Sequence, residues 1–130
     1  GAVFRIDLKS GRISLVVNAE RLPGLSTPNG LALDGASHLL LLDFGSGILH
    51  RIKLADNSSQ KIAEGFDGGD GLTWDKFGRL FITSWKTGKV WGIPRPGQKP
   101  ILISEGAEKG GFEQAADKDV WQRREYFSRF

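Results

Sequence analysis

Two side chains that could bind a metal ion occupy equivalent places in an internal repeat. Asn29 and Asp70 lie 41 residues apart, and each is followed by a glycine and an apolar residue. Amide and carboxylate oxygens suit hard cations such as Ca²⁺, which takes six to eight oxygen ligands. If both side chains reach one point, they supply part of such a site, and a missing repeat, a partner chain or water must supply the rest. We therefore predict that their oxygens lie within about 5 Å of each other, as ligands of one ion would.

A purely structural interpretation of the same two residues also stands. Asn-Gly and Asp-Gly pairs form turns, because their side chains hydrogen-bond to the local backbone and tolerate left-handed geometry. The equivalence of the two positions in the repeat favours a shared site, and the chemistry of turns favours a local role. The residues alone leave both interpretations open.

The repeat runs through most of the chain. Residues 28–34 (PNGLALD) align without gaps with residues 69–75 (GDGLTWD), and apolar and glycine positions continue to match at the same offset. A period of about 40 residues, rich in strand and turn signals, is typical of β-propeller blades. Equivalent loops of successive blades converge on a central channel, so we expect Asn29 and Asp70 to reach the same rim of that channel.

The expected fold is all-β: about two and a half four-stranded blades of a six-bladed β-propeller within residues 1–106. A partial blade covers residues 1–20, and full blades cover residues 28–65 and 69–105. The predicted strands are residues 3–8, 12–17, 31–33, 38–44, 48–54, 60–63, 72–74, 79–84, 89–93 and 100–103.

The chain is short for a closed ring. Six blades at this period need roughly 240 residues, whereas the chain has 130 residues and no methionine. We therefore expect a processed, truncated or excised piece of a longer protein, or a ring completed by another chain. Open blade faces and unpaired strand edges invite association. This predicts a homodimer or a complex with another chain.

Residues 107–130 break the repeat. Apolar residues fall near helical spacing, with acidic residues early and basic residues late, an order that suits the helix macrodipole. The segment is either a short amphipathic helix that covers exposed blade surface or a disordered end, and both alternatives stay open.

Composition excludes several classes of protein. The absence of cysteine rules out disulfides and thiolate metal sites. No apolar run approaches the roughly 18 residues of a membrane helix, and no signal peptide opens the chain. The net charge of +3 is small and scattered, unlike the basic stripe of nucleic-acid-binding proteins. We expect a soluble chain without nucleic-acid or membrane partners, in a compartment that the sequence leaves open.

Other polar and aromatic residues have structural interpretations. His38 and His50 are predicted to lie at the surface, since no third histidine or paired carboxylate accompanies them. Residues 67–71 (DGGDG) lack the ligand spacing of an EF-hand and are interpreted mostly as a flexible link between blades. Tryptophans are expected to pack between sheets, with channel lining as the alternative for Trp85; they are Trp74, Trp85 and Trp91.

Two segments resemble consecutive motifs of the regucalcin/gluconolactonase family, the senescence-marker-protein-like sugar lactonases. Residues 28–33, followed by Asp43, resemble the motif P-N-G-[LIM]-A-[FL]…D. Residues 70–82 resemble the next motif, D-G-[ML]-x-x-D-x-x-G-x-[LI]-[WYF]-[VI]. The resemblance covers residues 1–105, although strictosidine-synthase-like propellers share the general shape. It implies a six-bladed propeller that opens sugar lactones with one divalent metal.

The resemblance also implies roles for the two repeat residues. Asn29 would be a metal ligand, and Asp70 would be a ligand and the candidate general base. The metal, Ca²⁺ first with Zn²⁺ or Mg²⁺ as alternatives, would polarise the lactone carbonyl and activate water. The family's glutamate ligand and its substrate-binding asparagine and arginine have no counterpart here. The sequence therefore predicts part of a metal-dependent sugar-lactone hydrolase with an incomplete site; the alternative is a non-catalytic binding or assembly module.

Overall fold

The computed structural model describes residues 1–95 and 97–105, which form ten strands in three antiparallel sheets. The described residues contain no helix, so the predicted all-β class is confirmed. The first sheet is a hairpin of β1 (Ala2–Ile6) and β2 (Ile13–Asn18). The middle sheet contains β3 (Pro28–Asp34), β4 (His38–Asp43), β5 (Ile48–Lys53) and β6 (Ser59–Glu64). The last sheet contains β7 (Gly69–Trp74), β8 (Leu80–Ser84), β9 (Lys89–Ile93) and β10 (Ile101–Glu105).

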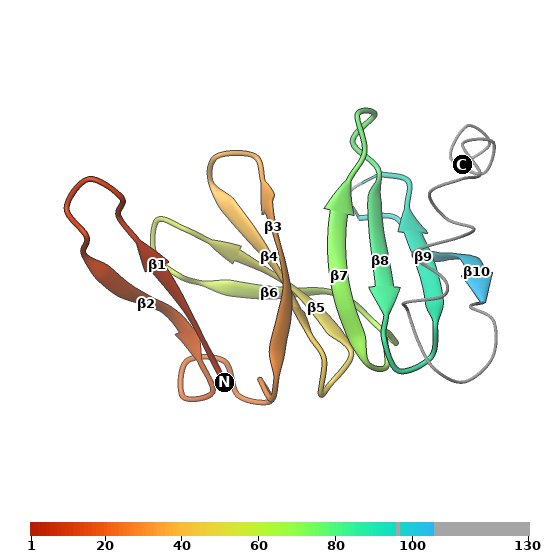
Figure 1. Cartoon of the computed structure of the whole chain (residues 1–130), viewed down its shortest axis with the longest axis horizontal. Helices are drawn as coiled ribbons and strands as arrows, with labels where there is room; N and C mark the ends of the chain where they lie inside the picture. Colours follow the sequence, from red (N-terminus) through yellow and green to blue (C-terminus); the bar gives the residue numbers. More distant parts are fainter. Residues whose placement is uncertain (96, 106–130) are drawn as a thin grey trace.

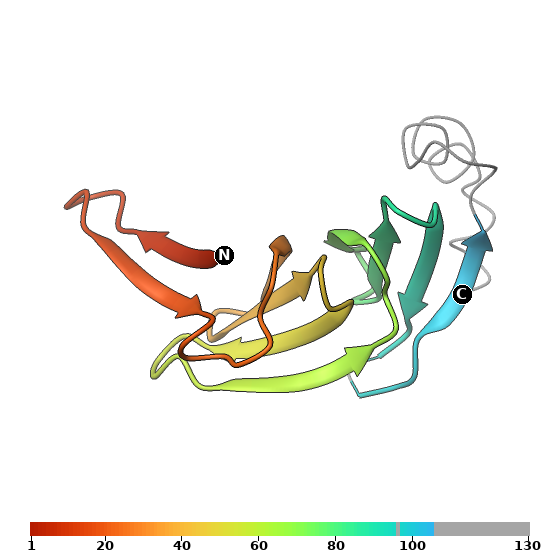
Figure 2. The same cartoon turned by 90° about the horizontal axis from the view of Figure 1, so that it is seen from below.

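The three sheets follow one another in chain order along the molecule (Figure 1) and stand in an arc when seen from below (Figure 2). Each four-stranded sheet is a meander, in which every strand pairs with the next one along the chain. The first strands of the two sheets, β3 and β7, run next to each other. At the far end of this pair, the indole nitrogen of Trp74 donates a hydrogen bond to the carbonyl of Leu33, 2.7 Å away and 41 residues back. The repeat in the sequence is therefore a repeat in space.

Within the middle sheet, β4 is buried on both faces, which explains its apolar run. Leu41 faces the hairpin and packs with Val17, whereas Leu40 and Leu42 face the last sheet and pack with Ile82. All three leucines are at most 1% exposed. A strand covered on both faces has a continuous apolar sequence rather than an alternating one. The strand predicted over residues 38–44 is thus a buried strand at the centre of the fold.

The first strand of each four-stranded sheet, which we call its inner strand, begins earlier than the sequence predicts. We expected strands from residues 31 and 72, but β3 begins at Pro28 and β7 at Gly69. Pro28 pairs with Asp43, and Gly69 pairs with Ser84, so the ladder continues through segments whose composition indicates turns. Asn29 and Asp70 are therefore strand residues rather than loop residues.

The glycine-rich segment before β7 is packed, which contradicts the flexible link predicted there. Gly68 and Gly69 are both buried. A Cβ atom on Gly69 would lie 2.8 Å from the side chain of Leu42, and one on Gly68 would lie 2.2 Å from the Cβ of Lys86. Both positions are glycine because other segments of the same protein pass too close to leave room for a side chain.

The turn between β7 and β8 forms as predicted. Gly78 has φ of +76°, which favours glycine, and the carboxylate of Asp75 accepts the backbone N–H of Phe77 and of Arg79. Burial alone would raise the pKa of Asp75, but hydrogen bonds from Arg79 and Phe77 outweigh it, so the pKa lies below its ordinary value.

The helix predicted within residues 107–130 lies outside the described residues. Within the residues that are described, no helix is long and apolar enough to cross a membrane.

Candidate functional site

Asn29 and Asp70 meet at one end of the inner strands, which we call the rim. The amide nitrogen of Asn29 donates a hydrogen bond of 2.7 Å to Oδ1 of Asp70. Asn29 is exposed and Asp70 is half-buried, so the pair is open to solvent. The predicted meeting of the two side chains is confirmed, whereas their roles as metal ligands remain a prediction.

Irregular pairing at the same place in both sheets aims these side chains. The β3–β4 register shifts between Pro28 and Gly30, which leaves Asn29 without a ladder partner. The β7–β8 register shifts between Gly69 and Leu72, which does the same for Asp70. A bulge frees a residue from the regular alternation and redirects its side chain. The rim geometry is thus built into the backbone of both strands.

Glycine at position 30 allows the two strands to approach each other. A Cβ atom on Gly30 would lie 2.7 Å from the backbone carbonyl oxygen of Asp70 and 3.2 Å from the side chain of Leu72. Any larger residue would push β3 away from β7. The Asn-Gly pair therefore serves contact between the sheets rather than a tight turn.

A buried carboxylate holds the segment that leads into β3. Asp43, fully buried, accepts hydrogen bonds from the backbone nitrogens of Ser26 and Thr27. It also accepts bonds from the backbone nitrogen and the hydroxyl of Ser46 in the following turn. One side chain thus ties the β4–β5 turn to the chain immediately before Asn29.

The last sheet has a hydroxyl at the equivalent position. Ser84, also fully buried, donates to the carbonyl of Asp67 at 2.6 Å and accepts the backbone N–H of Thr87 at 3.0 Å. It holds the segment that leads to Asp70. Sequence reasoning used Asp43 only as part of a motif and missed this structural role, although the offset of 41 residues aligns it with Ser84.

An aromatic pair lies at the same end of the sheets. Phe44 and Trp85 are again 41 residues apart, and their ring centroids lie 6.4 Å apart at 47°. Their backbone nitrogens donate to Thr27 and Gly68, the residues two places before Asn29 and Asp70.

The outcome for the tryptophans is mixed. Trp85 is 56% exposed, so its predicted packing between sheets is wrong, because the position follows the end of β8. Trp74 and Trp91 do pack against the core between the middle and last sheets, as predicted.

His50 is buried, in contrast to the predicted surface position. It is 6% exposed, and its Nδ1 has no hydrogen-bond partner. The hairpin covers the face of β5 that looks polar in the sequence, and this burial lowers the pKa of His50 although Asp43 opposes the shift. His38 lies at the start of β4, half-buried, with Nδ1 2.8 Å from the hydroxyl of Ser37.

The rim fits a divalent cation in the type of its donors. Asn29 and Asp70 supply an amide oxygen and a carboxylate, which are ligands of Ca²⁺ and Mg²⁺. Across the described residues, no group of three or more histidine, cysteine, aspartate or glutamate side chains could hold a metal. Ca²⁺ takes six to eight oxygen ligands, so a site at the rim would need ligands beyond these two side chains.

Comparison of the chain with models of protein families and with curated proteins gave no match. The resemblance of residues 28–33 and 70–82 to sugar lactonases thus remains a prediction.

Proposed function

We propose that the chain is about two and a half blades of a six-bladed β-propeller, and that its rim binds one divalent cation, Ca²⁺ before Zn²⁺ or Mg²⁺, in a sugar-lactone hydrolase site. The contact between Asn29 and Asp70 supports this proposal most directly. Two residues that the repeat makes equivalent, from two different sheets, meet at one solvent-open point, and both side chains carry oxygen atoms of the kind that bind Ca²⁺. A turn-forming role alone does not require the two to meet.

The residues at the rim have separable tasks in this reaction. When bound, the cation acts as a Lewis acid toward the lactone carbonyl. Asn29 positions the carboxylate of Asp70 through the 2.7 Å hydrogen bond seen here. That carboxylate accepts a proton as water adds to the carbonyl carbon, and the ring C–O bond breaks as the ring oxygen gains a proton. The exposed ring of Trp85 offers the apolar face of a sugar a surface for packing.

The cation site is tested by thermal unfolding of the chain in a Ca²⁺ titration. We expect Ca²⁺ to raise Tm, because a ligand that binds only the folded state stabilises it in proportion to RT ln(1 + [L]/Kd). Asp70→Asn and Asn29→Ala should each abolish the shift. Asp67→Asn is the matched control, since Asp67 is an exposed acid three residues away that is paired with Lys86. A Ca²⁺ shift that survives in Asp70→Asn would contradict the proposed ligand.

The activity is tested separately by following hydrolysis of gluconolactone in a pH-stat. We expect turnover that depends on Ca²⁺ and is lost in Asp70→Asn, with Asp67→Asn retaining it. A shift in Tm without turnover would support binding and exclude the hydrolase from this chain.

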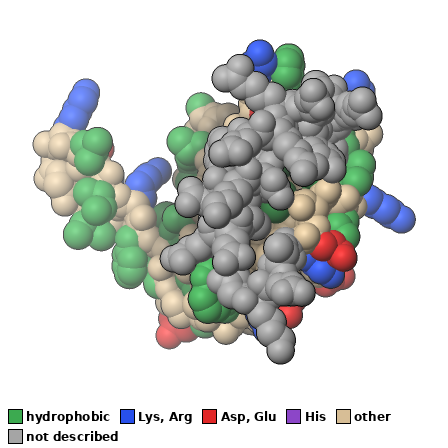
Figure 3. Space-filling view, turned by 45° about the vertical axis from the view of Figure 1, so that its right-hand side comes forward, with side chains coloured by type: hydrophobic (Ala, Val, Ile, Leu, Met, Phe, Trp, Pro, Cys, Tyr) green, Lys and Arg blue, Asp and Glu red, His purple; other side chains and the backbone are tan. Residues whose placement is uncertain are grey.

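The second candidate is a non-catalytic module that assembles with a second copy of itself. It is favoured by an apolar face on the β1–β2 hairpin, where Phe4, Ile6 and Ile13 are 57–64% exposed. Hydrophobic side chains run along the hairpin that projects from the body in Figure 3. Sheet faces of the same kind already pack on each other within the chain, so the face suits another sheet.

Light scattering tests this second candidate. We expect a dimer for the unaltered chain and monomers for Phe4→Ser and Ile13→Ser. Leu8→Ser is the matched control, since Leu8 is 94% exposed beyond the end of β1. A monomer at high concentration would refute the assembly.

A further inference from the structure

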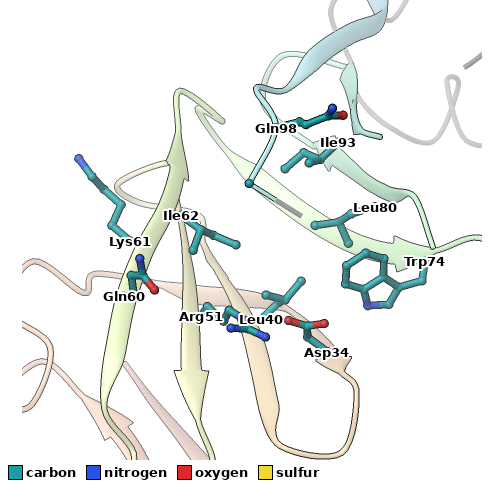
Figure 4. A pocket seen from close by; sticks show the side chains of 11 residues that line it. Asp34, Leu40, Arg51, Gln60, Lys61, Ile62, Trp74, Leu80, Ile93 and Gln98 are labelled. Atoms are coloured by element: carbon teal, nitrogen blue, oxygen red, sulfur yellow. Dashed lines mark hydrogen bonds and ion pairs between the residues drawn. The ribbon is translucent and has the colours of Figure 1, made fainter. Parts of the chain in front are cut away.

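A groove lies between the middle and last sheets, at the opposite end of the inner strands from the rim. Asp34 and Trp74, the last residues of β3 and β7, stand at one end of it (Figure 4). Its volume is about 350 Å³, toward the lower end of the 300–1,000 Å³ range typical of small-molecule sites. The groove is thus large enough for a small ligand and is separate from Asn29 and Asp70.

The walls of the groove are apolar. Leu40, Leu80 and Ile93 belong to the core between the sheets and are at most 5% exposed. Ile62 from β6 is 39% exposed and points across the groove toward Leu80 and Ile93 in Figure 4. The indole N–H of Trp74 is already bonded to Leu33, so its ring offers only apolar surface. These walls suit the hydrocarbon body of a ligand.

One end of the groove is polar. Nε of Arg51 donates to Oδ2 of Asp34 at 2.6 Å, and the side chain of Arg51 is 39% exposed. Arginine carries five N–H donors in a rigid fork. Among the described residues, the terminal nitrogens of Arg51 have no acceptor within hydrogen-bond distance. These donors suit a carboxylate, which accepts a pair of parallel hydrogen bonds from a guanidinium.

Lys61 does not contribute to this polar end. Its side chain points away from the groove in Figure 4 and forms an ion pair with Glu64 at 3.1 Å. The carboxylate of Asp34 is already matched by Arg51, so a cationic ligand would find no unpaired acid there. Among the described charged groups that line the groove, Arg51 is therefore the one we expect to meet a ligand.

We propose that this groove binds a small aliphatic monocarboxylic acid, with the carboxylate on the terminal nitrogens of Arg51 and the hydrocarbon chain along Leu40, Leu80 and Ile93. The site needs neither the cation at the rim nor lactone hydrolysis. It lies where Ile62 of β6 and Gln98 border the core between the two sheets, beside the ion pair of Arg51 and Asp34.

The test is a titration of the full 130-residue chain with octanoate, followed by two-dimensional NMR of backbone and indole N–H groups. Saturable shifts are expected at the Trp74 indole and at Gln98, which borders the groove. Octan-1-ol should bind at least tenfold more weakly, because a hydrogen bond to a charged group is worth about 1.5–3 kcal/mol. Octylamine should not bind.

Variants separate the two ends of the ligand. Arg51→Gln should weaken octanoate about tenfold and leave octanol unchanged, whereas Ile62→Ser should weaken both. Arg51→Lys, which keeps the charge beside Asp34 but loses the fork, should give an intermediate loss. Lys61→Gln is the matched control and should change neither affinity.

The proposal would be overturned by any of three results. These are the absence of saturable shifts at Trp74 with millimolar octanoate, equal binding of octylamine, and unchanged octanoate affinity in both Arg51 variants.

Discussion

The middle and last sheets anchor the segment before their first strand with side chains of opposite hydrogen-bonding character. Asp43 accepts backbone N–H groups from the segment before β3, whereas Ser84 donates to a backbone carbonyl in the segment before β7. Both are fully buried and 41 residues apart. Both repeats therefore anchor the inner strand from the same position. An acceptor, Asp43, stands where the backbone offers N–H groups, and a donor, Ser84, stands where the backbone offers a carbonyl.

The two sheets also differ where they touch, and the difference makes the contact. Asn29 donates to Asp70, and Trp74 donates to the carbonyl of Leu33. Two aspartates at the rim would repel each other, because like charges that share a site disfavour ionisation. Divergence between the repeats thus gives complementary partners at both ends of the β3–β7 pair.

Removal of the buried anchors should have the largest effect. Asp43→Ala should lower the free energy of unfolding by roughly 3–5 kcal/mol, since hydrogen bonds to a charged group are worth about 1.5–3 kcal/mol each and buried donors lose their acceptor. Ser84→Ala should lower it by only about 1–2 kcal/mol, because the bonds lost are neutral. Urea unfolding measures both. Equal losses would show that the two anchors do not differ as described.

Replacing glycine by alanine should destabilise the protein more at a contact between two sheets than at a contact within one sheet. Gly30→Ala places Cβ 2.7 Å from the backbone oxygen of Asp70, and overpacking of this kind costs about 1–3 kcal/mol. Gly71→Ala meets the hydroxyl of Thr83 at the same distance, and that side chain can rotate away. We expect a smaller loss for Gly71→Ala in urea unfolding. The reverse order would contradict the close approach of β3 to β7.

Asn29→Asp makes the two repeats alike at the rim. It replaces a hydrogen bond by repulsion between two carboxylates that are open to solvent, which is worth about 1 kcal/mol at 4 Å in bulk water. We expect a loss of that order without metal, and a larger Ca²⁺-induced rise in Tm than the unaltered chain shows. A loss that added Ca²⁺ leaves unchanged would argue against a cation at this point.

The smallest expected effect is a pH dependence confined to the middle sheet. His50 corresponds to Trp91 in the last sheet, and burial lowers the pKa of His50 below its ordinary 6.5. The unfolded chain therefore takes up a proton at a higher pH than the folded chain does, so stability is complete above about pH 6.5 and falls as the pH drops below it. The urea midpoint should decline between pH 7.5 and 5, and His50→Gln should flatten this decline. A midpoint that rises toward pH 5 would show the opposite sign.

Much of the fold follows from local pattern. The spacing of β-prone runs and turn residues predicts the ten strands near their observed positions, and the run from Leu39 to Leu42 predicts a buried strand. The errors lie where a neighbouring strand decides the outcome. Residues 28–30 and 69–71 have the composition of turns but belong to strands, because β4 and β8 extend far enough to pair with Pro28 and Gly69.

The candidate site divides in the same way. The repeat alone indicates that Asn29 and Asp70 belong to one rim, because equal spacing along the chain places them at equal positions in successive sheets. The bulges that aim them, the burial of His50 under the hairpin and the groove beside Arg51 depend on how sheets pack on one another. Such contacts join residues from separate sheets, so no local pattern specifies them. Sequence therefore determined the modules and their order. Tertiary packing decided which side chains meet, because a contact between two sheets depends on the residues of both segments and on how the sheets are placed.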